Sequence, residues 1–182
     1  MAISGLLRRG IFRSSGWDLV AGNEAESEPE AVHLVTVDWQ RGKWAQMKGM
    51  YSREHVWHLL GGAKLKASDS PALLPKGFQD RAAVNPENML VGAISSAHML
   101  SWLNVAFGMG IEVVSYQDQA HGVLTEICAG EVWVSEVILK PRITFDPRFD
   151  VSADVIAKVH ELAHENCFIA RSVKSKVTVR PV

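Results

Sequence analysis

Three residues near the carboxyl end of the chain have the types and the spacing of a metal-dependent hydrolase site. His160, Glu161 and His164 form the pattern H-E-x-x-H, which on a helix places two imidazoles one turn apart with a carboxylate beside them. Such imidazoles bind Zn²⁺, and the glutamate acts as the base. A zinc site also needs a third protein ligand, and after Glu165 only Cys167 could supply one. Because short matches to this pattern arise often by chance, a zinc-dependent hydrolase is one alternative among several.

A charge-free stretch in the middle of the chain predicts a long helix. No charged residue occurs in 88–111; Asn85 is a candidate N-cap, Pro86 a first helical residue, and Gly108 and Gly110 a helix end. The stretch is long enough to cross a membrane, but polar side chains recur in it and no basic cluster flanks it. We therefore expect no membrane partner and a helix buried nearly all round, against a sheet or a second subunit.

Segments rich in β-branched and alternating residues lie on both sides of this helix and predict strands. We expect strands at 31–39, in pieces of 43–62, and at 112–117, 122–127, 131–145 and 176–182. A second helix is predicted over 150–172, with Ser152 or Asp150 as its cap. The order of elements predicts one α+β domain with an antiparallel sheet, which spans 31–182.

Composition limits the classes of function. The chain has 182 residues, a net charge of -1 and two cysteines, so we expect no nucleic-acid partner, no disulfide framework and a reducing compartment. No cofactor is expected. Residues 1–30 predict an N-terminal extension, and residues 1–16 contain three arginines and no acid. The expected location is the cytoplasm, or the mitochondrion if residues 1–16 are a targeting segment.

Several segments, in their order along the chain, resemble the OsmC/Ohr family of osmotically inducible and organic hydroperoxide resistance proteins. They are NPENMLVGAISSAHMLSWL, VVSYQDQAHGVL, VILKPRITF and LAHENCFIARSVKSKVTVRP, with YSREHVWHLLGG typical of one subgroup. The resemblance covers about residues 35 to 182, and it makes AHENC part of the family's cysteine-bearing helix. It implies an OsmC-like fold, an antiparallel sheet packed with a long buried central helix, in an intertwined homodimer. It also implies a thiol peroxidase that reduces an organic hydroperoxide with a dithiol reductant.

The resemblance assigns roles to four positions. Cys167 matches the resolving cysteine, Glu87 the glutamate, and Arg53 the arginine that orients the peroxide and lowers the pKa of the peroxidatic thiol. The peroxidatic position, at which the family has the attacking cysteine, holds Ala97 in SSAHML. An alanine methyl cannot attack an O–O bond or form a sulfenic acid, so two-cysteine activity is not expected. Cys128 is interpreted as a small residue at a hairpin.

Three hypotheses remain open. The chain is a natural family member that has lost the two-cysteine cycle, and it either binds an apolar ligand or uses Cys167 alone. Alternatively, its lineage is active and the cysteine at position 97 has been replaced by engineering. In the third hypothesis the chain is an unrelated zinc hydrolase. Trp102 and Phe107 on the long helix are further candidates for lining a pocket.

Overall fold

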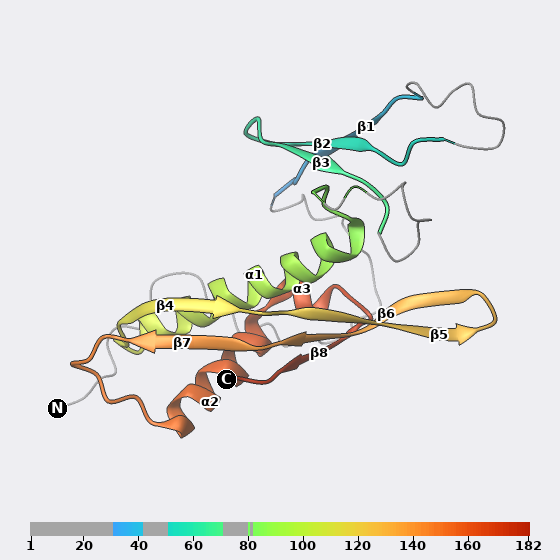
Figure 1. Cartoon of the computed structure of the whole chain (residues 1–182). Coiled ribbons are helices and arrows are strands. Elements are labelled where there is room, and N and C mark those ends of the chain that lie inside the picture. The colour runs from blue at the N-terminus through green and yellow to red at the C-terminus, as the bar shows by residue number, and fades with distance from the viewer. Residues whose placement is uncertain (1–30, 42–50, 71–79, 81) are drawn as a thin grey trace, which may run out of the picture. The chain divides into compact units, whose positions relative to one another are not determined.

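A computed structural model of the chain describes residues 31–41, 51–70, 80 and 82–182. Leu34–Val182 forms one compact unit. The predicted extension, residues 1–30, lies outside the described residues, so the domain boundary at residue 31 stays a prediction. The described elements mix helices and strands, as expected (Figure 1). They are β1 (Val35–Trp39), β2 (His55–Leu59), β3 (Lys64–Ala67), α1 (Pro86–Gly108), β4 (Val113–Asp118), β5 (His121–Cys128), β6 (Glu131–Leu139), β7 (Pro141–Phe145), α2 (Ala153–Asn166), α3 (Phe168–Arg171) and β8 (Lys176–Val179).

Helix α1 begins and ends where the sequence predicts. The side chain of Asn85 accepts a hydrogen bond from the backbone N–H of Asn88 at 2.8 Å, and Pro86 needs no acceptor at the first position. After the helix, Gly110 has a φ of 72°, a left-handed conformation that a residue with a Cβ rarely adopts. Local sequence alone therefore fixes both ends of this helix.

The burial of α1 differs from the prediction. Only one face is buried in the single chain, formed by every fourth residue: Ile94, His98, Trp102 and Ala106. On other faces Leu100 is 60% and Phe107 is 85% exposed. By length and composition the helix could cross a membrane, a test that core helices of soluble proteins also pass. In the single chain the sheet and α2 cover one side of α1, and the second subunit that would cover the other faces stays a prediction.

Strands β4 to β7 form a long antiparallel ribbon. Strand β5 pairs with β6 and β4 with β7, while Gln119 and Ala120 separate β4 from β5 and Lys140 separates β6 from β7. Asp118 bridges this interruption: one carboxylate oxygen accepts the backbone N–H of Lys140 at 2.6 Å, and the other accepts the Ser95 hydroxyl of α1 at 2.5 Å. One side chain therefore replaces a missing ladder bond and ties the ribbon to the helix.

Strand β8 extends the sheet of β5 and β6, and its direction corrects the predicted topology. It pairs with β6 in parallel, with Glu136 opposite Lys176 and Leu139 opposite Val179. The predicted sheet was antiparallel throughout. The two helices α2 and α3 lie between β7 and β8 in the chain and act as the crossover that a parallel pair requires. This pairing depends on tertiary packing, so the strand pattern of 176–182 could not reveal its direction.

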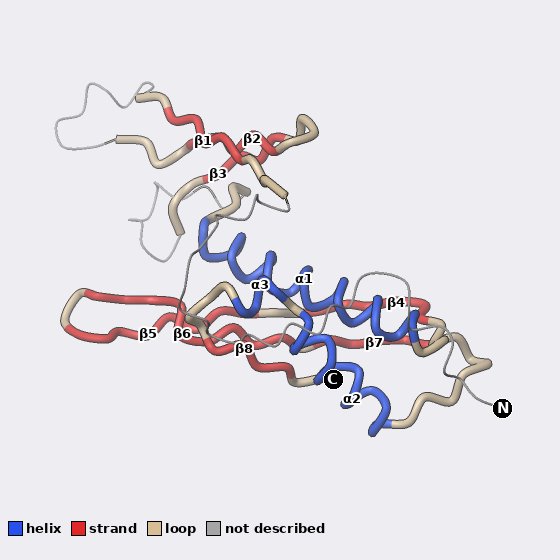
Figure 2. Tube along the Cα trace, turned by 180° about the vertical axis from the view of Figure 1, so that it is seen from behind, coloured by secondary structure: helices blue, strands red, loops and turns tan. Residues whose placement is uncertain are grey.

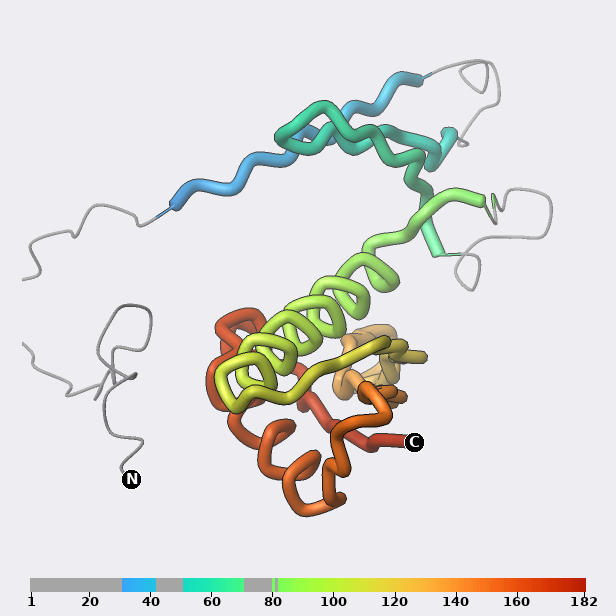
Figure 3. The backbone as a smooth tube through the Cα atoms, turned by 90° about the vertical axis from the view of Figure 1, so that its left-hand side faces the viewer, coloured from blue at the N-terminus to red at the C-terminus, as the bar shows by residue number. Residues whose placement is uncertain are grey.

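All three helices lie on the same face of strands β4 to β8 (Figures 2 and 3). One core cluster joins Trp102 and Ala106 of α1 to Val159 and Ala163 of α2, and another joins the amino-terminal half of α1 to β6. At Gly122 of β5 an added Cβ would lie 2.9 Å from a methyl carbon of Val91 in α1. Glycine at this position therefore allows the helix to approach the strand closely.

The second predicted helix is divided in two. Ser152 caps α2 by accepting the backbone N–H of Val155 at 3.4 Å, which confirms one of the two predicted caps. The helix then stops at Asn166, because Cys167 has extended backbone angles (φ -82°, ψ 97°), and α3 begins at Phe168. The break places Cys167 in a helix junction rather than inside a helix.

Strands β1 to β3 form a three-stranded antiparallel sheet with two different faces. Strand β3 was not predicted separately. On one face Asp38 accepts from His58 at 3.0 Å beside the lysines of β3. The other face carries Val35, Val37 and Trp39, all exposed. The sheet is joined to the segment before α1 by backbone hydrogen bonds between residues 66–68 and Val84.

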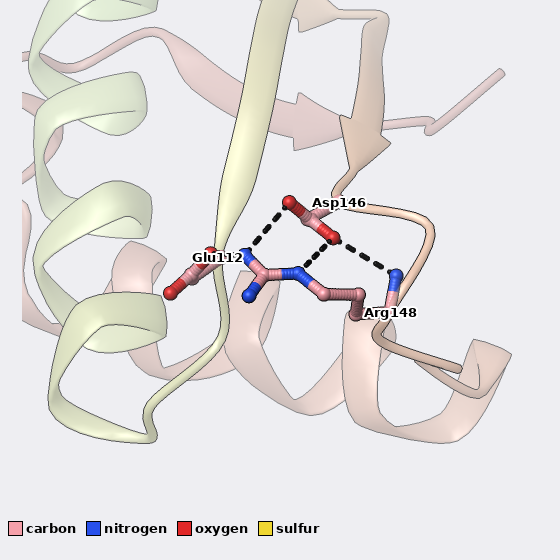
Figure 4. Close-up of polar contacts among 3 residues, drawn as sticks. All are labelled: Glu112, Asp146 and Arg148. Carbon is pink, nitrogen blue, oxygen red and sulfur yellow. Dashed lines mark hydrogen bonds and ion pairs between the residues drawn. The ribbon is translucent and has the colours of Figure 1, made fainter.

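A charged cluster ties together the end of the β4–β7 pair (Figure 4). The guanidinium of Arg148 donates to Asp146 at 2.9 and 3.0 Å and to Glu112 at 2.8 Å. Arg148 holds the pKa of the Asp146 carboxyl below its usual value. All three residues lie at the surface in a polar setting, so the cluster fixes local geometry rather than forming a reactive site.

Candidate functional site

The peroxidatic position lies in the middle of α1. Ala97 is half-buried, between the exposed Ser96 and the buried His98. The three residues occupy different faces of the helix because successive residues are rotated by about 100°. Ser96 and His98 therefore do not replace a thiol at position 97, and a serine hydroxyl has no comparable redox chemistry.

His98 and His160 form a buried pair, called here the histidine pair. Nε2 of His98 and Nδ1 of His160 are 3.1 Å apart, and the two ring planes differ by 3°. One nitrogen donates and the other accepts, and the indole of Trp102 packs against His160 with its ring centroid 5.6 Å away. Burial lowers the pKa of each imidazole to about 4, so both rings are neutral near pH 7.

Several polar atoms around the histidine pair have no hydrogen-bond partner among the described residues. They are the outer nitrogens of both rings, Nδ1 of His98 and Nε2 of His160, together with the Trp102 indole nitrogen and the Tyr116 hydroxyl. Burial also raises the pKa of Tyr116. A buried polar group without a partner costs free energy, so these unpaired atoms lower the stability of the folded state.

The three residues of the zinc-hydrolase alternative do not face one common site. His160 is directed into the core and bonded to His98, whereas His164 is exposed. Glu161 accepts a hydrogen bond from Lys158 at 2.5 Å at the surface. No group of three metal-ligating side chains gathers anywhere in the described ranges. The motif matched because two helical histidines one turn apart are common, but tertiary packing turns them to different environments.

The two cysteines lie in different environments. Cys167, at the junction of α2 and α3, is 1% exposed and belongs to the core, whereas Cys128 is exposed at the end of β5, beside the hairpin turn. Both thiols are free. The hairpin interpretation of Cys128 is confirmed.

Of the two further pocket candidates, Trp102 is fully buried in the core and Phe107 is on the surface, and neither lines a cavity described below.

Arg53 borders a hollow on the apolar face of the β1–β3 sheet. This hollow, called here the Arg53 pocket, has a volume of about 450 Å³. Its lining consists of Val37, Trp39, Tyr51, Ser52, Arg53, His55, Ser68, Asp69 and Pro86. The volume is within the range of pockets that bind small organic molecules. The sequence indicated Arg53 but not its aromatic neighbours, because Trp39 and Tyr51 lie well apart in the sequence.

Glu87 lies in the first turn of α1. One of its carboxylate oxygens, Oε2, is buried and has no hydrogen-bond partner among the described residues. The N-terminal end of a helix favours a negative charge, which accounts for its position but not for its unpaired oxygen.

Comparison with known proteins identifies the family. The family model of OsmC-like proteins matches residues 77–181, more than half of the chain. The chain belongs to the OsmC-like family. A solved OsmC-like protein of unknown function from Vibrio cholerae is 38% identical and superimposes with a TM-score of 0.79, covering 84% of this chain and 99% of that one. The resemblance inferred from SSAHML and AHENC is thereby confirmed.

More distant relatives show the same fold. An organic hydroperoxide resistance protein from Elizabethkingia anophelis has a TM-score of 0.62 at 15% identity, over 85% of this chain and 96% of that one. OhrB of Bacillus subtilis has a TM-score of 0.59 at 16% identity, over 83% and 96%. The uncharacterized protein YmaD of Bacillus subtilis is 24% identical over 99 residues, which are 53% of this chain and 64% of that protein.

The four positions assigned by resemblance are not joined in this OsmC-like chain. No hydrogen bond or ion pair within the described residues links any two of Arg53, Glu87, Ala97 and Cys167. Arg53 contacts Tyr51 instead. Their roles therefore stay predictions. Sequence reasoning missed Asp118 and the pairing of His98 with His160. The spacing of four between Ile94, His98, Trp102 and Ala106 could have indicated that His98 is buried, but not which residue it bonds.

Proposed function

We propose that this OsmC-like protein is a homodimer that binds an apolar small molecule of the organic hydroperoxide class and lacks the two-cysteine peroxidase cycle. One observation carries the proposal: alanine occupies the peroxidatic position, while Arg53 borders an apolar pocket. Binding chemistry is thus retained without the attacking atom. The names of the hydroperoxide resistance proteins with the same fold support this class of ligand.

The positions of the two cysteines support the loss of the cycle. A two-cysteine cycle needs a thiolate that meets the peroxide and a second thiol that condenses with the resulting sulfenic acid. Cys167 is buried, and Cys128 is exposed at the end of β5. Neither is placed at the peroxidatic position. Two free cysteines also support the expected reducing compartment, the cytoplasm, which stays a prediction.

Exposed apolar side chains support the homodimer. Leu100 and Phe107 are exposed on α1, and Val37 and Trp39 are exposed on β1. Further large apolar side chains are exposed on the β5–β6 hairpin: Leu124, Ile127, Val132 and Trp133. Exposed large apolar side chains of this kind are candidates for burial in a protein interface. Light scattering after gel filtration should give a dimer mass, and a clean monomer at micromolar concentration would count against this part of the proposal.

The decisive experiment is dithiol-dependent consumption of an organic hydroperoxide. We expect no turnover by the protein and none by Cys167→Ser, because neither contains an accessible thiol at the peroxidatic position. Ala97→Cys should create or greatly raise turnover. Turnover by the unchanged protein that disappears in Cys167→Ser would show a one-cysteine enzyme instead. A folded Ala97→Cys variant that stays inert would show that position 97 is not the peroxidatic position.

A further inference from the structure

The walls of the Arg53 pocket are built before any ligand binds. The indole N–H of Trp39 donates to the backbone carbonyl of Ser52 at 2.7 Å, and the rings of Trp39 and Tyr51 meet edge to face with centroids 6.3 Å apart. Val37 lies on the same face of β1 as Trp39, because strand side chains alternate. Rigid aromatic and aliphatic surface of this kind binds an apolar body at small entropic cost.

Arg53 supplies the positive charge of this pocket. Its guanidinium carbon lies 4.0 Å from the centroid of the Tyr51 ring, and Nη1 donates to the Tyr51 hydroxyl. The ion pairs of the described residues do not include Arg53. A guanidinium stacked on an aromatic ring keeps its charge and several N–H donors, and its planar fork matches a carboxylate.

Asp69 is the acid in the lining, and it does not neutralise Arg53. Its Oδ1 accepts the backbone N–H of Ser70 at 2.9 Å, and it forms no ion pair with Arg53. The two opposite charges at different places in one pocket give a bound molecule a preferred orientation. An anionic group is attracted to Arg53 and repelled by Asp69.

We propose that the Arg53 pocket binds an amphipathic carboxylate, with its carboxylate on the Arg53 guanidinium and its apolar body on Trp39 and Val37. This inference rests on the proposed function, in which the pocket takes an apolar small molecule, and adds the charge of that molecule.

The test compares two ligands with the same apolar chain, octanoate and octanol, by isothermal titration calorimetry at neutral pH. We expect octanoate to bind the unchanged protein about tenfold more tightly than octanol, because one charge-assisted contact distinguishes them. Arg53→Gln should abolish that preference by lowering the affinity for octanoate to that for octanol. Arg53→Lys should keep part of it, since charge remains without the planar fork. Asp69→Asn should raise octanoate affinity, and added salt should lower it.

The outcomes separate this inference from the proposed function. If octanol binds as tightly as octanoate, or if Arg53→Gln keeps the preference, the pocket takes an apolar molecule but the carboxylate assignment is wrong. If neither ligand binds, both the inference and the ligand-binding function fail. Arg148→Gln is the matched control, because it removes an exposed guanidinium outside the pocket and should leave both affinities unchanged.

Discussion

The histidine pair and the Arg53 pocket both combine aromatic rings with groups that can carry positive charge, and they differ in their access to water. His98 and His160 are almost completely buried, between α1 and α2. Arg53 is exposed at the edge of a hollow. Burial lowers the pKa of both imidazoles and holds them neutral, whereas the Arg53 guanidinium is in contact with water.

Because of this difference, the histidine pair contributes to the stability of the fold and the Arg53 pocket is suited to binding a ligand. A neutral pair in the core strengthens the contact between two helices, and any charge placed there must lose its hydration. A stacked guanidinium at a pocket contributes little to folding but offers a ready partner for an anion. Residue types that can do chemistry therefore indicate a functional site only where a ligand can reach them.

The largest effect is expected from breaking the histidine pair. His160→Ala should lower the free energy of unfolding by about 3 kcal/mol, because it removes packing against Trp102 and leaves a second nitrogen of His98 without a partner. Urea denaturation measures the change. His164→Ala removes an exposed imidazole one turn along the same helix and should change stability by less than about 0.5 kcal/mol. Equal effects of the two substitutions would contradict the assignment.

A fall in pH should lower the free energy of unfolding through the histidine pair. Burial lowers the pKa of each ring from its ordinary value of about 6.5 to about 4 in the folded chain, so the unfolded chain binds more protons between these values. The contribution is complete above about pH 6.5, declines as the pH falls to about 4, and amounts to about 3 kcal/mol per ring. Urea midpoints across this range measure the slope.

A double substitution isolates this pH dependence from that of the carboxylates. His98→Leu with His160→Leu replaces both partners by apolar side chains, which avoids an unpaired nitrogen. The slope between pH 6.5 and 4 should then flatten relative to the unchanged protein. An identical slope in the two proteins would show that other groups control the acid response.

Asp118 should have the next largest effect, because its half-buried carboxylate accepts two hydrogen bonds that join the strands to α1. Asp118→Ala leaves the backbone N–H of Lys140 and the hydroxyl of Ser95 without their acceptor and should lower stability by about 2 kcal/mol. Thermal or urea unfolding measures it. Glu131→Ala, at an exposed position at the start of β6, is the control and should shift stability by less than about 0.5 kcal/mol.

The smallest effect on folding is expected at the Arg53 pocket. Arg53→Gln should change the free energy of unfolding by less than about 0.5 kcal/mol, since the side chain is exposed and contacts Tyr51 at the surface. Circular dichroism melts of the variant and of the unchanged protein measure it. A large loss of stability would mean that Arg53 holds the sheet together, and the contrast between the two regions would disappear.

Local signals in the sequence predict much of the fold. The caps at Asn85 and Ser152 and the end of α1 near Gly108 are set by residues a few positions apart, and each was found. The break at Cys167 was missed, because its extended backbone angles have no signature in a sequence pattern that continues helically. The direction of β8 was also missed, since parallel pairing follows from the crossover through α2 and α3.

The candidate site was predictable only in part. Arg53, Glu87, Ala97 and Cys167 could be named by resemblance, and Arg53 does border a pocket. The partner of His98 lies 62 residues away, so H-E-x-x-H was first interpreted as a metal motif. Asp118 likewise serves two elements that are distant in sequence. Long-range hydrogen bonds of this kind depend on packing and leave no local pattern.

The sequence by itself determined the family, the caps at Asn85 and Ser152 and the absence of a thiol at position 97, because these depend on residue identity and on short-range spacing. Only the tertiary structure decided which histidines are paired and buried, which cysteine is exposed, and which face of α1 is covered. Burial sets the cost of a charge, and burial is a property of elements brought together from distant parts of the chain. That is why His160, in the stretch with the strongest chemical motif, lies in the core, while the Arg53 pocket forms where the sequence showed only a loose match.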